Sequence, residues 1–119
     1  MKKIAILTAI SLCMAATAFA ADSINLNFTN TGLSLWGSKT TAVSGTGLIG
    51  KTSTGVGLGV KTAPTGYAAV TQHKNGTKAF GSSHDSTAVF STDVPTVGTP
   101  VTGPTTADSA LFSSGWTAM

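Results

Sequence analysis

The stretch Gly45–Thr52 has the residue types and spacing of a phosphate-binding loop. It satisfies the pattern G-x-x-x-x-G-K-[ST], and its three glycines also satisfy G-x-G-x-x-G. In such a loop backbone N–H groups surround the phosphates; here Lys51 would reach the β- and γ-phosphates and Thr52 would bind Mg²⁺. The motif works only between a buried strand and a helix, and Ser53–Gly57, which follows, is poor helix material. Nucleotide binding through Gly45–Thr52 is therefore a disfavoured, minor alternative.

Three adjacent residues, His84, Asp85 and Ser86, have the side chains of a hydrolase triad. Neighbouring side chains on an extended chain point to opposite faces, so these three cannot align as a proton relay. A turn between strands, in which Asp85 and Ser86 bond nearby backbone groups, explains them better.

His73 and His84 are the only histidines, and thus the first candidates for a metal pair. The hairpin described below separates them by six residues, or about 20 Å at ~3.4 Å per residue, too far for one ion. The chain after residue 20 also contains no Cys and no Glu, so thiolate and paired-carboxylate chemistry lack their groups. We therefore predict no catalytic residue, no metal site and no cofactor, and a protein that is not an enzyme.

Three aromatic side chains are candidates for ligand contact, because a flat aromatic surface can stack on a sugar or another planar ligand. They are Trp36, Tyr67 and Trp116. The alternative is that all three belong to the core or cover the sheet, as aromatic residues of small domains usually do.

The first 20 residues have the three-part layout of a secretory signal peptide. A basic start, Lys2–Lys3, precedes the apolar run Ile4–Ala16. That run is short for a membrane span, and no stop-transfer segment follows it. We expect cleavage after residue 20, read from the small residues Ala18, Ala20 and Ala21. Residues 21–119 then form a single small β domain of 99 residues in the periplasm, at the cell surface or outside the cell.

Cleavage would remove most of the positive charge and the only cysteine, Cys13. Five lysines and four aspartates remain, with no Arg, which gives a formal charge of +1. Scattered lysines do not neutralise a phosphate backbone, so we expect no nucleic-acid partner, and contact with a membrane only through export. A net charge near zero also gives little protection against self-association.

The patterns after residue 20 are typical of short strands. Ser23–Phe28 alternates polar and apolar residues with the period of two that a half-buried strand requires. A turn at Asn30–Gly32 would lead into a second strand from Leu33 to Trp36, and Ser86–Thr92 indicates a further one.

The clearest local signal is a hairpin at Asn75-Gly76, a pair that tolerates the positive φ angles of a type I′ turn. Tyr67–Lys74 would pair with Thr77–His84. This register places Thr71 opposite Phe80, and Tyr67 opposite His84.

An internal repeat, G-x-G-L-x-x-K-T, occurs at Gly45–Thr52 and again at Gly55–Thr62. Two copies are too few for a solenoid, so we interpret them as successive strands of one design. In the second copy Gly57 and Gly59 share one face, which another backbone can approach closely. Inside the fold that means tight packing; between molecules it would mean stacking.

Helix signals are scarce, because glycine and proline interrupt nearly every window. The exception is Ala107–Ser114, preceded by Thr105 in a capping-box spacing with Asp108 and followed by Gly115. The Pro/Thr-rich segment 94–104, from Val94 to Pro104, is typical of an extended connector.

Together these patterns predict an all-β fold, a small antiparallel sandwich or open barrel with at most one short C-terminal helical turn. The predicted core consists of the larger apolar residues: Ile24, Leu26, Phe28, Leu35, Trp36, Leu58, Val60, Tyr67, Val70, Phe80, Val89, Phe90, Phe112 and Trp116.

The leading functional hypothesis is a small exported β-protein with a structural or surface role, whose partner is itself, as a homo-oligomer or polymer. The alternative is a monomeric periplasmic or secreted binding module that uses its aromatic residues on an unknown protein or glycan.

Overall fold

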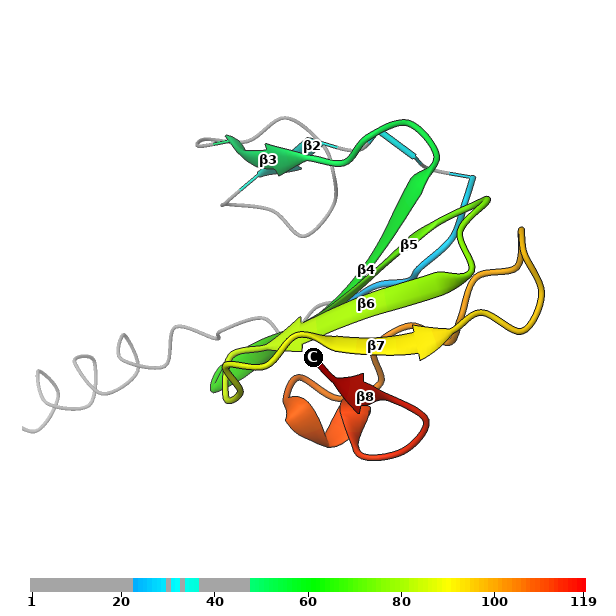
Figure 1. Ribbon diagram of the computed structural model, residues 1–119. Helices are drawn as coiled ribbons and strands as arrows, with labels where there is room; N and C mark the ends of the chain where they lie inside the picture. The colour runs from blue at the N-terminus through cyan, green and yellow to red at the C-terminus, as the bar shows by residue number, and fades with distance from the viewer. Residues whose placement is uncertain (1–22, 30, 33, 37–47) are drawn as a thin grey trace, which may run out of the picture.

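The computed structural model describes residues 23–29, 31–32, 34–36 and 48–119, shown in colour in Figure 1. The predicted signal peptide and its cleavage site lie outside these residues. Within the described part no helix is long and apolar enough to cross a membrane. The elements there are β1 (Ser23–Ile24), β2 (Ser34–Trp36), β3 (Leu48–Lys51), β4 (Val56–Ala63), β5 (Gly66–His73), β6 (Lys78–Ser83), β7 (Phe90–Asp93), the 3-10 helix η1 (Ser109–Phe112) and β8 (Thr117–Ala118).

All strand pairs of the described residues are antiparallel. Six strands form the main sheet in the order β1-β4-β5-β6-β7-β8, and β2 pairs with β3 in a separate two-stranded sheet. Figure 1 shows the small sheet set apart from the large one, and η1 beside β8 near the C-terminus. The predicted small antiparallel all-β fold with one short C-terminal helical turn is confirmed.

The β5–β6 hairpin has the predicted register. Thr71 lies opposite Phe80, and the backbone N–H of His84 donates to the carbonyl of Tyr67 at 3.1 Å. The turn type, however, is not the predicted type I′.

That turn lies one residue earlier than predicted. Gly76 N–H donates to the carbonyl of His73 at 2.8 Å, which centres the turn on Lys74 and Asn75. Neither Asn75 nor Gly76 has a positive φ. Gly76 therefore occupies the last position of the turn, where glycine is common, and a Cβ there would lie 3.1 Å from the carbonyl oxygen of His73.

Several strands begin or end at other residues than predicted. Of Ser23–Phe28 only the first two residues pair with β4, and Ser86–Thr92 becomes a strand only at Phe90. The two copies of the repeat do contain successive strands, β3 and β4, but these belong to different sheets.

The core lies against one face of the main sheet, which we call the inner face. Its strand register brings together small side chains from three neighbouring strands, with Val70 between Gly59 and Gly81, and Gln72 between Gly57 and Ala79. Two non-strand segments, residues 25–28 and 94–116, cover this face. The core residues are Leu26, Ala68, Val70, Ala79, Val94 and Phe112, with Phe90, Val101, Leu111 and Trp116 packed against them.

Gln72 fixes the connector 94–104 to the inner face. Its side chain is 1% exposed, its amide nitrogen donates to the carbonyl of Thr99 at 2.9 Å, and its amide oxygen accepts from the N–H of Val101 at 2.8 Å. A buried amide with both polar atoms paired holds an otherwise irregular chain in place.

The helix η1 starts from Asp108, whose carboxylate accepts from the N–H of Ala110. Thr105, the predicted cap, does not have this role. Gly115 follows the helix at a φ of +77°, a conformation that favours glycine, and the chain then enters β8.

The opposite, outer face of the main sheet carries larger side chains. Leu58, Thr71 and Phe80 lie side by side on β4, β5 and β6. Phe80 is 40% exposed and Tyr67, on the same face, is 46% exposed.

Candidate functional site

Trp116 is the end of a short series of contacting aromatic rings that starts in the core. Phe90 stacks on Phe112 with ring centroids 4.5 Å apart and an interplanar angle of 10°. Phe112 meets Trp116 edge to face at 5.1 Å and 78°. Since Phe112 is buried, the indole ring is held from behind by a rigid support.

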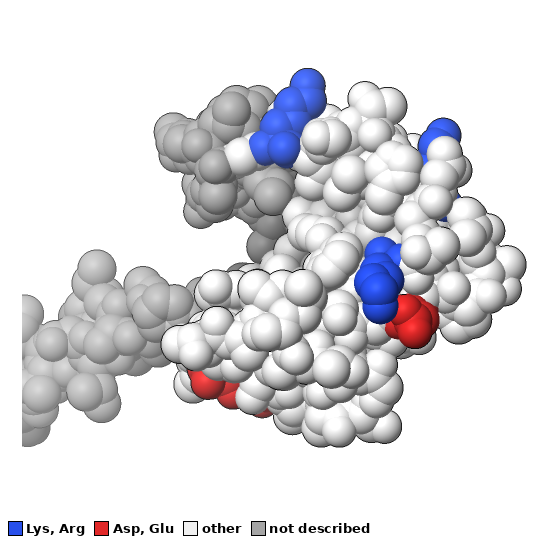
Figure 2. All heavy atoms as spheres, viewed as in Figure 1, with Lys and Arg blue, Asp and Glu red and all other residues white. Residues whose placement is uncertain are grey.

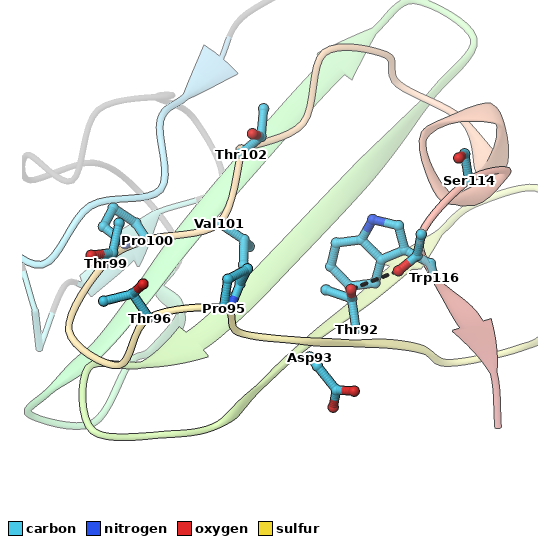
Figure 3. Close-up of a pocket in the computed structure, with 11 residues that line it drawn as sticks. Thr92, Asp93, Pro95, Thr96, Thr99, Pro100, Val101, Thr102, Ser114 and Trp116 are labelled. Carbon is cyan, nitrogen blue, oxygen red and sulfur yellow. Dashed lines mark hydrogen bonds between the residues drawn. The ribbon is translucent and has the colours of Figure 1, made fainter.

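An open groove of about 470 Å³ lies in front of Trp116 (Figure 3). The end of β7, the connector and the residues before β8 form its walls, and Figure 3 shows Pro95 and Val101 across from the indole ring. Thr92 steadies one wall, because its hydroxyl donates to the carbonyl of Gly115 at 2.6 Å. The groove is lined by Thr92, Asp93, Pro95, Thr96, Thr99, Pro100, Val101, Thr102, Ser114, Gly115 and Trp116.

We call this hollow the Trp116 groove. Four threonines, a serine and one carboxylate surround its aromatic ring and two prolines. Such a lining offers a flat apolar surface together with hydroxyl groups that donate and accept hydrogen bonds. It suits an uncharged polyhydroxyl ligand better than an ion.

A second hollow, of about 440 Å³, adjoins the groove at Thr92, Asp93 and Gly115. The ion pair Lys78–Asp93 lines it, with the ammonium nitrogen 2.7 Å from the carboxylate and side chains 53% and 85% exposed. A pair so exposed contributes little to stability. On the face in Figure 2 the charged side chains stand in small separate groups on a mainly uncharged surface.

The structure does not combine the three predicted aromatic residues into one platform. Tyr67 lies on the outer face, whereas Trp116, which precedes β8, belongs to the cover of the inner face; β6 and β7 separate β5 from β8. Trp36 lies in β2, and its side chain is outside the described part.

Tyr67 has a local partner of its own. The ring of His84 lies 6.2 Å from the ring of Tyr67 at an angle of 48°, and the backbone N–H of Tyr67 donates to His84 Nδ1 at 3.2 Å. Both residues stabilise the open end of the β5–β6 hairpin.

The side chains of Asp85 and Ser86 form turn and cap contacts. Asp85 accepts from the backbone N–H of Ser109 at 2.8 Å and from its hydroxyl at 2.7 Å. These hydrogen bonds hold the pKa of the Asp85 carboxyl below its usual value, and the bond from the Ser109 hydroxyl contributes most. The nearest ring nitrogen of His84 is 4.0 Å from Asp85, and Ser86 accepts from the N–H of Ala88.

His73 lies at the other end of the hairpin from His84. Its Nδ1 accepts from the N–H of Asn75 at 3.1 Å. In the described residues no three His, Cys, Asp or Glu side chains gather closely enough to hold a metal ion.

The phosphate-loop pattern falls on strands. Gly50 and Lys51 end β3, and a turn at Thr54–Gly55 leads directly into β4. The helix that would supply N–H groups to a phosphate does not follow the motif. Its first residues, 45–47, lie outside the described part.

No protein family, curated protein or solved structure matches this chain. Sequence reasoning singled out Trp116 but missed the other walls of its groove. The available signal was the crowding of Thr and Pro at 94–104, which we interpreted only as a connector.

Proposed function

We propose that this chain is exported after cleavage behind Ala20 and serves as a structural β-protein that associates with further copies of itself. The observation that carries the proposal is the open main sheet: in the described part, β1 pairs with only two residues of β4, and β8 pairs with only two residues of β7. An open edge presents backbone N–H and C=O groups to which another strand can pair.

Short edge strands themselves limit pairing, but neither of these two contains a residue that blocks it. Proteins that stay monomeric commonly place lysine or proline on their edges, whereas β1 is Ser-Ile and β8 is Thr-Ala. Thr92 and Asp93 of β7 pair with β6 on one side, but on the side of β8 they have no strand partner in the described part. The small net charge of the mature chain adds little repulsion between copies.

The test is to recover the mature protein from the periplasm, the cell envelope and the medium, and to read its N-terminus from the intact mass. Size-exclusion chromatography at increasing concentration and negative-stain microscopy should then show oligomers or polymers. A monomer that persists at high concentration would contradict the assembly role, and an unprocessed mass would contradict export.

A second function, the binding of a neutral saccharide, is favoured by the Trp116 groove. The supporting observation is the rigidly backed indole ring beside threonine hydroxyls. Sugars stack their apolar C–H faces on aromatic rings while side-chain oxygens and hydroxyls fix their orientation.

This second function can be tested with the variant Trp36→Phe, in which Trp116 is the only tryptophan. Its emission should shift and saturate with a neutral oligosaccharide, and the further change Thr92→Val should weaken that response. Emission that stays constant across a panel of neutral and charged oligosaccharides would exclude the groove as a saccharide site.

A further inference from the structure

Residues Ser23–Phe28, which we call the N-terminal segment, cover part of the inner face of the main sheet. Its first two residues pair with β4, Ser23 with Lys61 and Ile24 with Val60. After Ile24 it leaves the ladder and crosses the inner face, where Leu26 becomes 6% exposed.

Leu26 sits in a slot made by three glycines. A Cβ at Gly57 would lie 3.0 Å from the Leu26 Cδ1, and a Cβ at Gly59 would lie 3.0 Å from its backbone nitrogen and 3.1 Å from its Cβ. On the other side, a Cβ at Gly103 would lie 3.2 Å from the same nitrogen. Since a side chain at these positions would crowd the segment, the slot between β4 and the connector accommodates the segment only because these residues are glycines.

The N-terminal segment also carries part of its own shape. The side chain of Asn27 donates to the carbonyl of Asn25 at 3.2 Å and accepts from the N–H of Thr29 at 3.1 Å. The first bond lies within the segment and the second comes from the residue that follows it, so both can persist when the segment leaves the slot. Its ladder to the sheet is two residue pairs long.

We infer that the glycine slot of one copy accepts the N-terminal segment of a second copy. The occupant has the right chemistry, because the same sequence already fills the slot within one chain, with Leu26 buried in it. Exchange between copies recreates these contacts, so concentration rather than new chemistry drives it. A copy that donates its segment to one neighbour and accepts one from another extends a chain.

This inference rests on the proposed function, since cleavage after Ala20 would leave the segment two residues from a free N-terminus. It adds the partner surface and the mode of assembly. Strand addition at β8 is the competing route, and the experiment must separate the two.

Single cysteines can report exchange, because the mature chain contains none. Ile24 and Val60 are cross-strand partners, at a spacing that a disulfide can bridge. We would mix the variants Ile24→Cys and Val60→Cys, incubate them under mild oxidation and identify the mixed dimer by intact mass. The expected result is a mixed dimer whose yield rises with concentration.

The matched control is a mixture of Ile24→Cys with Thr117→Cys, which lies on the exposed β8 at the opposite edge. Random collision would favour this more exposed pair, whereas segment exchange favours the first pair. Equal yields in both mixtures would overturn the inference.

When the double variant Ile24→Cys/Val60→Cys is oxidised, its disulfide links the N-terminal segment to β4 of the same chain. It should then stay monomeric, and reduction should restore assembly. If the oxidised variant with its intrachain bond still assembles like the wild type, assembly uses another edge: the inference fails and the proposed function stands. If the wild type does not assemble and the two single-cysteine variants yield no mixed dimer, both fail.

Discussion

At the scale of single residues, Gln72 links the main sheet to the connector. It is nearly fully buried, and both polar atoms of its amide pair with the connector. The variant Gln72→Leu keeps the volume but leaves the Thr99 carbonyl and the Val101 N–H without partners. We expect a loss of about 2 kcal/mol in the free energy of unfolding, since orphaned buried groups cost about 1–3 kcal/mol.

Denaturant titration followed by tryptophan emission measures this loss. The control is Thr71→Val, the neighbouring residue on the outer face, where we expect a change within about 0.5 kcal/mol. Equal stability of the two variants would show that the connector is held by packing alone.

Asp85 gives the fold a defined response to acid. The hydrogen bonds from Ser109 lower its pKa in the folded state, so the ionised carboxylate stabilises the fold. That contribution is complete above the unfolded pKa of about 3.9 and is lost as the pH falls through the lower folded pKa. Between pH 5 and 2, a range of about 3 units that spans the folded and unfolded pKa of Asp85, the Tm of the wild type should therefore fall more steeply than the Tm of Asp85→Asn.

The partner variant Ser109→Ala checks the cause. It removes the hydroxyl that contributes most to the lowered pKa, so its acid response should lie between those of the wild type and Asp85→Asn. Parallel Tm curves for all three proteins would assign the acid response to other groups.

Residue burial was only partly predictable from the sequence. Leu26, Val70 and Phe112 are buried as predicted, but Tyr67 and Phe80 are 46% and 40% exposed. Alternation defines two faces of a strand without saying which one will be covered. Here the covered face is the one with the smaller side chains, which is why the buried Ala68 and Ala79 were missed: they belong to the face that other segments can approach closely.

At the scale of elements, the β5–β6 hairpin illustrates what local chemistry can decide. The flanking residues and the position of Asn75-Gly76 predicted the register, which the structure confirms. The turn type was wrong because Gly76 closes the turn at its last position. The walls of the Trp116 groove come from two segments, residues 92–102 and 114–116. The crowding of Thr and Pro marked the first segment, but no local pattern places it beside the second.

The inner face of the sheet must lack a side chain at Gly81 for its cover to fit. A Cβ at Gly81 would collide with the ring of Phe112, whereas a Cβ at Gly50 would meet nothing within 4 Å. Neither glycine has a positive φ. We expect Gly81→Ala to reduce the free energy of unfolding by about 1–3 kcal/mol through overpacking, and Gly50→Ala to raise it by up to about 1 kcal/mol through the unfolded chain.

Thermal and denaturant unfolding of both variants measure the difference. If Gly81→Ala were as stable as Gly50→Ala, the contact between η1 and the sheet would be loose enough to adapt.

At the scale of the whole molecule, the inner face of the main sheet is covered, whereas its two edges are open in the described part. The large main sheet ends on both sides in strands of two residues, and the outer face exposes aromatic rings. The abundant Thr and Gly and the several short strand patterns predicted the antiparallel all-β class. The strand order could not be predicted, because β1 pairs with β4, while β2 and β3, which lie between them in the sequence, form a separate sheet.

Two matched lysine variants can show whether the β8 edge of the main sheet takes part in assembly. Thr117 and Thr105 are both exposed, one on the edge strand β8 and the other in the segment after the connector. Thr117→Lys and Thr105→Lys therefore change charge and composition equally, but only the first places an ammonium group on an edge, where it opposes pairing with another strand. If copies assemble only by exchange of the N-terminal segment, both variants should form the same oligomers by size-exclusion chromatography and light scattering. A selective loss of large species in Thr117→Lys would instead show that strands add at β8, and the oxidised Ile24→Cys/Val60→Cys protein would then retain its assembly.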